Sequence, residues 1–209
     1  MRTTTIKLGL PALMAAMLLA SALSAASARN LEVSNQNWRV TWSRLEFENL
    51  TFTLRCQVTF EGSFHSRIIP KVARLLIGAI TRITIKEESC SGGSISPDRP
   101  PPWHLTYEGF TGRLPTIETL RLLIQRLQIA FRIVGITCKY GRETDGLAVS
   151  AVLGAAGEIR TFTPLPPQSI VSLLEGLGAC PQASNLVSGA SDGRVTLLNS
   201  TALLTIRLI

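Results

Sequence analysis

The stretch TFTLRCQVTFEG, residues Thr51–Gly62, alternates apolar and polar residues over most of its length. A period of two is typical of a β-strand with one buried side. The apolar side also carries a cysteine, so we expect this strand to anchor both the core and a disulfide. The residues on the apolar side are Phe52, Leu54, Cys56, Val58 and Phe60.

Similar alternation recurs in both directions along the chain. It predicts strands over residues 38–42, 81–86 and 103–108, a hairpin of 147–153 with 158–163, and a last pair of 194–198 with 202–209. Roughly nine or ten strands separated by turn residues predict an all-β, mainly antiparallel fold. The architecture we expect is a β-sandwich or a closed or partly closed barrel with one or two short helices.

Two segments favour those short helices. In Ser66–Ile80 the apolar residues change to helical spacing, with Pro70 near the start and Gly78 at the end. A proline is tolerated in the first turn of a helix, and glycine commonly ends one. Gln168–Gly176 is the second candidate.

Residues 116–127 fit either a helix or a strand. The leucines and isoleucine satisfy both periods. The β-branched and aromatic residues that follow favour two strands with a break at Gln125–Arg126.

Residues 1–28 have the pattern of a secretory signal peptide. Basic residues precede the apolar run Leu8–Ala20, and small residues lead to a cleavage site after Ala28. The apolar run is shorter than the roughly 20 residues that span a bilayer. An uncleaved N-terminal anchor is the alternative. We expect residues 29–209 to form a single disulfide-stapled β domain without a stable membrane span.

The chain has four cysteines, Cys56, Cys90, Cys138 and Cys180, and all of them follow the predicted signal peptide. An even number of cysteines in an exported chain indicates two disulfides, for which three pairings are possible. We favour Cys56–Cys90 and Cys138–Cys180, because each closes a local loop. There is no C-x-x-C, which argues against a redox enzyme or a zinc knuckle. The expected location is extracellular or in the cell envelope.

The formal net charge is +7, and 2 of the 21 basic residues lie in the predicted signal peptide. The basic residues are spread along the chain and are not interleaved with aromatics, so a nucleic-acid partner is not expected. The partners that this charge favours are anionic cell-wall polymers or other anionic surface material. The alternative is a solvated basic surface without a specific partner.

The sequence holds little that points to catalysis. Gly189–Gly193 matches G-x-S-x-G as text, but no histidine follows it, and we interpret it as a turn. His65 and His104 are the only histidines, and either could act as a general acid or base with Glu108 or Asp98. The alternative is that both lie on the surface or on a strand face. Their spacing does not suit a metal, and we expect no cofactor.

An aromatic group follows the run of three prolines. Trp103, Tyr107 and Phe110 are candidates to line a ligand groove. Aromatic residues at alternating strand positions also serve as core residues, which is the alternative.

The same region carries a resemblance. PWHLTYEGFTGRLP, residues Pro102–Pro115, is preceded by LRCQVTFEGSFH and followed by ITCKYG. With these segments the chain resembles a set of uncharacterised secreted actinobacterial proteins that share P-W-x-x-x-Y-x-x-F-x-G-x-L-P. The resemblance implies an exported, disulfide-bearing β-protein. No activity is assigned to these proteins, so it implies no catalytic residue.

The function we expect is that of a non-enzymatic extracellular or cell-envelope binding or structural module. One alternative is a small secreted hydrolase using His104 or His65. Another is a carrier of a hydrophobic ligand in a barrel lumen, which needs a cavity of roughly a few hundred Å³.

Overall fold

The structure is a computed structural model that describes residues 30–48, 52–113, 116–133, 135–142, 146–165, 170–176, 178, 180–181, 183–188 and 193–209. These residues form sixteen strands and no helix. The strands are β1 (Asn30–Val33), β2 (Asn37–Glu48), β3 (Thr53–Phe64), β4 (Ile68–Pro70), β5 (Leu76–Ser91), β6 (Ser94–Pro97), β7 (Trp103–Thr111), β8 (Thr119–Gln125), β9 (Gln128–Ile133), β10 (Ile136–Gly141), β11 (Leu147–Leu153), β12 (Ile159–Pro164), β13 (Ile170–Gly176), β14 (Ala183–Ser188), β15 (Arg194–Leu197) and β16 (Ile206–Leu208).

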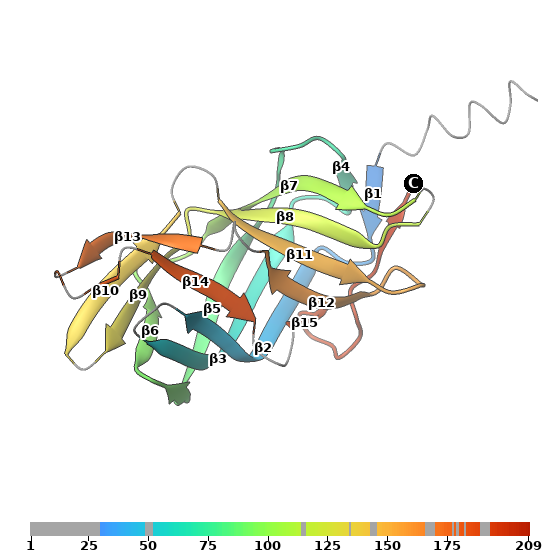
Figure 1. Ribbon diagram of the computed structural model, residues 1–209. Helices are drawn as coiled ribbons and strands as arrows, with labels where there is room; N and C mark the ends of the chain where they lie inside the picture. The colour runs from blue at the N-terminus through green and yellow to red at the C-terminus, as the bar shows by residue number, and fades with distance from the viewer. Residues whose placement is uncertain are drawn as a thin grey trace, which may run out of the picture.

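The strands form one large antiparallel sheet and one small one. The large sheet has the order β12-β11-β8-β7-β5-β3-β2-β14-β13-β10-β9-β6, and β15 pairs with β2 off this path (Figure 1). The sheet curls into a nearly closed barrel. The prediction of an all-β, mainly antiparallel fold of the sandwich or barrel class is confirmed.

Strand β2 changes its outer neighbour halfway along its length. Its first half, Trp38–Thr41, pairs with β15, and its second half, Leu45–Glu48, pairs with β14. A β-bulge at Ser43–Arg44 separates the halves. A bulge bends a strand and increases its twist. β2 therefore belongs to two parts of the sheet, one that includes β15 and one that includes β14. The two parts lie toward opposite sides of the view in Figure 1.

The edge of β12 closes onto the C-terminal part of the chain. The Phe162 N–H donates to the Gly193 carbonyl at 2.9 Å, and the Ile159 N–H donates to Leu204 at 2.8 Å. β15 follows Gly193 and pairs with β2. These bonds therefore connect β12 to β2 through β15, and they close the part of the sheet that runs from β2 to β12.

The turn between β5 and β6 closes the other part of the sheet, which runs from β2 to β6. Gly92 and Gly93 both have positive φ, 88° and 146°. A Cβ on Gly92 would overlap the Thr53 carbonyl oxygen, and one on Gly93 would lie 2.6 Å from the Arg132 carbonyl oxygen. This contact of the turn with both β3 and β9 therefore requires glycine.

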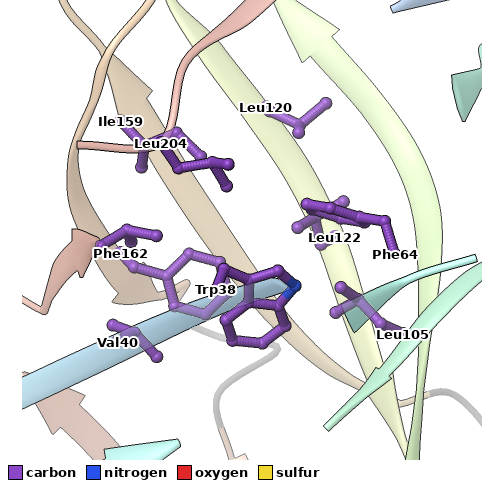
Figure 2. A pocket seen from close by; sticks show the side chains of 10 residues that line it. Trp38, Val40, Phe64, Leu105, Leu120, Leu122, Ile159, Phe162 and Leu204 are labelled. Atoms are coloured by element: carbon purple, nitrogen blue, oxygen red, sulfur yellow. The ribbon is translucent and has the colours of Figure 1, made fainter. Parts of the chain in front are cut away.

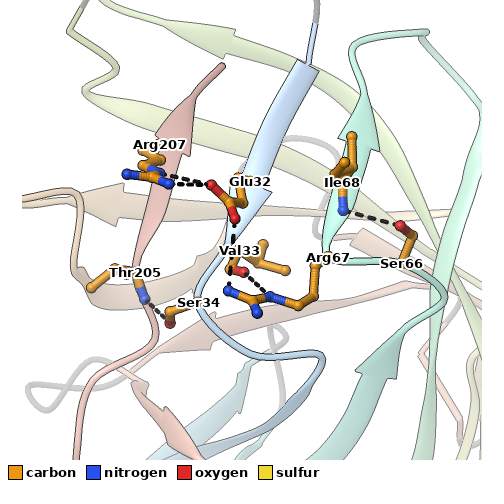
Figure 3. A network of polar contacts seen from close by, with 8 residues as sticks. All are labelled: Glu32, Val33, Ser34, Ser66, Arg67, Ile68, Thr205 and Arg207. Carbon is orange, nitrogen blue, oxygen red and sulfur yellow. Dashed lines mark hydrogen bonds and ion pairs between the residues drawn. The ribbon is translucent and has the colours of Figure 1, made fainter.

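The small sheet has the order β16-β1-β4 and joins both ends of the described chain. Glu32 on β1 binds Arg207 on β16 at 2.6 Å, and Arg67, just before β4, approaches the same carboxylate at 3.7 Å (Figure 3).

The core lies inside the curled sheet and follows the predicted alternation. Leu54, Cys56, Val58 and Phe60 are at most 4% exposed. Aromatic rings fill much of the space, with the largest fully buried side chains at Trp42, Trp103, Tyr140 and Phe131.

Both favoured disulfides are confirmed. Cys56–Cys90 ties β3 to β5 over 34 residues, and Cys138–Cys180 ties β10 to the segment after β13 over 42 residues. Each stabilises the fold by about 4 kcal/mol in the loop-entropy model. Two disulfides suggest an oxidising, extracellular environment.

The two predicted helices are wrong. In Ser66–Ile80 the chain forms β4, a turn and the start of β5, with Gly78 inside the strand. Gln168–Gly176 contains β13, which pairs with β10. Pairing with distant strands has overridden a helical spacing only a few residues long, which is common for weak local preferences.

The strand alternative for residues 116–127 is confirmed. β8 ends at Gln125, and Arg126 has a positive φ of 65°. The predicted break marks the point at which the chain leaves the β7–β8–β11 part of the sheet for the β9–β10 part.

Two predictions lie outside the described residues. These are the signal peptide with its cleavage site after Ala28, and all of the G-x-S-x-G segment except Gly193. The predicted hairpin near the C-terminus is present as a Thr196–Leu203 bridge, but β15 and β16 pair mainly with β2 and β1.

Candidate functional site

Three threonines form a line across the outer face of the sheet. Thr41 on β2 is paired in register with Thr59 on β3, which is paired with Thr84 on β5. The hydroxyl oxygens of Thr41 and Thr59 lie 3.1 Å apart. We name these three residues the threonine row. Because neighbouring strands lie about 4.8 Å apart, the row spans about 10 Å.

Four cations surround the threonine row. Arg39 and Arg82 lie in the adjacent register row, and Arg194 pairs with Thr41 at the end of the row. Lys86 lies two residues beyond Thr84 on β5. The side chains of Arg82 and Lys86 are 71% and 55% exposed, so their charged groups are accessible to a ligand.

Two carboxylates lie among these cations. Glu61 lies beside Arg39 and Arg82, and the Glu88 carboxylate lies 3.6 Å from the Lys86 Nζ. Arg39 donates from Nε and Nη2 to Glu61 Oε1 at 2.9 and 2.6 Å, and Arg82 Nη1 lies 3.5 Å from Glu61 Oε2. The Glu61 side chain is only 13% exposed, whereas the side chains of Arg39 and Arg82 are 42% and 71% exposed. The main effect of Glu61 is to orient two guanidinium groups, while the surface around the row keeps an excess of positive charge.

Farther along β2 and β5 this face carries both charges. Glu46 pairs with both Arg44 and Arg55, at 2.9 and 2.8 Å, and Glu88 pairs with Lys86 at 3.6 Å.

This arrangement suits binding of anions. Guanidinium groups bind phosphate, sulfate and carboxylate oxygens through several N–H donors. Threonine hydroxyls can donate to such oxygens or accept from sugar hydroxyls. A linear array of this kind fits a repeating anionic polymer better than a single small ion.

The two histidines do not form a catalytic group among the described residues. His65 is exposed and lines a notch of about 60 Å³ with Ser66 and apolar side chains, and no carboxylate lines that notch. His104 is half-buried on β7 between Ala79 and Gln125. No hydrogen bond or ion pair joins either imidazole to another described side chain.

The aromatic residues after the prolines divide between core and surface. Trp103 and Tyr107 are 0% and 3% exposed, so the core alternative is confirmed for both. Burial raises the pKa of the Tyr107 phenol. Phe110 is half-buried, and the Lys71 Nζ lies 5.5 Å from the centre of its ring.

Apolar side chains fill two places inside the barrel where a ligand could otherwise lie. One space is lined by Trp38, Val40, Phe64 and neighbours (Figure 2). A second is lined by Phe47, Ile129 and other apolar side chains. Each cavity measures about 10 Å³. That volume is close to the minimum for one water molecule, so neither space holds a lipid-sized ligand.

A larger groove of about 310 Å³ lies on the surface between the Gly154–Gly157 turn and β16. Backbone, small side chains and aliphatic side chains line most of it. Its one charged lining residue, Arg207, already binds Glu32. The groove therefore offers less recognition chemistry than the threonine row.

The described part of the chain contains no group of three or more His, Cys, Asp or Glu side chains that could hold a metal ion. The same residues contain no apolar helix of membrane-spanning length.

The threonine row was not identified from the sequence. Thr41, Thr59 and Thr84 each occupy a polar position of a predicted strand, so their outward direction was predictable. Their alignment depends on the register of β2, β3 and β5, which the local pattern does not contain.

Comparison with models of protein families, with curated proteins and with solved structures gives no significant match. The resemblance to secreted actinobacterial proteins stays a prediction.

Proposed function

We propose that this protein is an exported, non-enzymatic binding module that holds anionic surface polymers on the threonine row. The polymers are those with repeating phosphate, sulfate or carboxylate groups, such as anionic cell-wall material. The observation that carries the proposal is the line of three hydroxyls with four cations and two carboxylates around it.

Export is supported by two independent features. The first 28 residues have the pattern of a signal peptide, and both disulfides suit an oxidising compartment. Two of the three strands that carry the row, β3 and β5, are also connected by Cys56–Cys90, so this part of the surface is covalently constrained.

The two alternative functions have less support. A hydrolase using His65 or His104 lacks a carboxylate partner among the described residues. A carrier would need a far larger interior space than the two apolar cavities of about 10 Å³ provide.

The test is binding to immobilised polyphosphate and polyglutamate by protein purified after export, with both disulfides intact. Replacing Arg82→Gln together with Lys86→Gln should weaken binding roughly tenfold to thirtyfold, since each cation near an anionic surface contributes about 1 kcal/mol. Binding should also weaken as the salt concentration rises.

The matched control is Arg121→Gln together with Arg132→Gln, which removes the same charge from exposed arginines on β8 and β9. Equal loss in both double variants would mean that only net charge matters, and the proposed site would be rejected. Wild-type protein that binds neither polymer at low salt would also reject it.

A further inference from the structure

Exposed apolar side chains gather in one short segment. Seven large hydrophobic residues are exposed in the part of the chain that the structure describes, and four of them lie within nine residues. Ile68, Val72, Leu75 and Leu76 are 48%, 56%, 38% and 41% exposed. They belong to Arg67–Leu76, the connection that contains β4 and leads from β3 to β5, which we name the apolar–basic segment.

Cations alternate with these apolar residues. Arg67, Lys71 and Arg74 lie within the segment, and no acidic residue occurs between Glu61 and Glu87. Arg67 is near Glu32 at 3.7 Å and Arg74 is near Glu108 at 3.1 Å, yet both arginine side chains remain more than half exposed. Arg207 shares Glu32 with Arg67 and is a further exposed cation, which lies across β1 from Ile68 (Figure 3).

The exposed side chains are held by backbone contacts on both sides. Ile69 is buried, and its strand pairs with β1. Arg74 has a positive φ of 67°, and its N–H donates to the Tyr107 carbonyl at 2.7 Å. The Tyr107 N–H in turn donates to the Leu75 carbonyl at 3.0 Å. The apolar surface is therefore a fixed feature of the fold.

We infer that the apolar–basic segment docks the protein on an anionic lipid surface. Ile68 and Leu76 line one notch, so exposed apolar side chains from the two ends of the segment lie together. Exposed apolar residues that gather in this way indicate an interaction site, and their alternation with cations complements anionic headgroups. In this arrangement the aliphatic side chains enter the region between headgroups and acyl chains, and the cations bind lipid phosphates. The inference does not rest on the proposed function, since different residues carry it.

A Val72→Trp variant tests the docking at its centre. Exported protein is mixed with vesicles of phosphatidylcholine that contain about 30% phosphatidylglycerol and bromine-labelled acyl chains. We expect quenching of the added tryptophan, and no added quenching in wild-type protein, because the three native tryptophans are at most 3% exposed. Absence of quenching, or equal quenching in vesicles of neutral lipid alone, would overturn the inference.

Sedimentation with the same vesicles provides a second test. Replacing Val72→Ser together with Leu75→Ser should lower the partition coefficient about tenfold, because two apolar side chains no longer leave water. The matched control is Val152→Ser together with Leu174→Ser, which alters two similarly exposed residues on β11 and β13. An equal effect of the control would assign binding to general hydrophobicity and overturn the inference. Polymer binding through the threonine row should be unchanged in both variants.

Discussion

The Trp42 indole Nε1 donates to the Phe162 carbonyl oxygen at 2.8 Å, across 120 residues of sequence. The bond is buried and joins β2 to β12 through the interior of the barrel. The Phe162 N–H also donates to the Gly193 carbonyl. Phe162 therefore connects β12 both to the core and to the start of β15. These contacts close the part of the sheet that runs from β2 to β12.

We predict that Trp42→Phe is more destabilising than Trp38→Phe. Both tryptophans are buried, but the Trp38 Nε1 has no hydrogen-bond partner among the described residues. Both variants lose stability because phenylalanine is smaller than tryptophan. Trp42→Phe also leaves the Phe162 carbonyl without this donor, which costs a further amount of about 1–3 kcal/mol. Urea unfolding of the two variants measures the difference. Equal losses would contradict a structural role for the bond.

Gly193→Ala should destabilise the protein by about 1–3 kcal/mol, because the added methyl group forces the interior to shift. Its Cβ would overlap the Trp42 indole nitrogen and lie 2.8 Å from the Phe162 oxygen. Gly109→Ala is the matched control, since nothing lies within 4 Å of a Cβ there. Thermal unfolding of both variants tests the prediction, and similar midpoints would refute it.

Removing Cys138–Cys180 with Cys138→Ala and Cys180→Ala should lower the free energy of unfolding by up to about 4 kcal/mol. Cys56→Ala with Cys90→Ala should have a similar effect, because the two loops have similar lengths of 42 and 34 residues. Denaturant unfolding under non-reducing conditions measures both. Unchanged midpoints would contradict the prediction, and peptide mapping that found Cys56 joined to Cys138 would contradict the topology.

Glu158 should contribute to stability in a pH-dependent way. Hydrogen bonds from Arg160, then from backbone N–H groups, hold the pKa of Glu158 below its ordinary value of 4.5. Because its pKa is lower in the folded state than in the unfolded state, its contribution is present above the unfolded value and is lost as the pH falls through the folded one. NMR titration of the carboxyl carbon measures this pKa. Arg160→Gln should raise it, and an unchanged value would refute the assigned cause.

Glu61→Gln should strengthen polyanion binding and lower the stability of the fold. The variant frees Arg39 and Arg82 from a carboxylate and raises the positive charge around the threonine row. The Glu61 side chain is only 13% exposed and accepts two hydrogen bonds from Arg39, so the variant should lower the free energy of unfolding by about 1–3 kcal/mol. Affinity for polyphosphate and urea unfolding are the two measurements. Weaker binding by Glu61→Gln would mean that the oriented guanidinium groups matter more than the net charge.

Much of the strand structure was determined by local sequence. The period of two in residues 51–62 was sufficient to assign β3 and its buried side, because a strand points alternate side chains to opposite faces. The break at Arg126 was also visible locally. The count and spacing of the cysteines led to both disulfides, because each pair closes a short loop.

The tertiary structure alone decided the partners of the strands, and with them the candidate sites. Thr41, Thr59 and Thr84 form one row only because β2, β3 and β5 pair in a particular register, which depends on contacts between distant residues. The apolar residues of Ser66–Ile80 suited a buried helical face when considered alone. Pairing of β4 with β1 instead leaves four residues of the apolar–basic segment exposed to solvent. Local periodicity determines which way a side chain points from its own strand, but long-range pairing determines whether anything covers it.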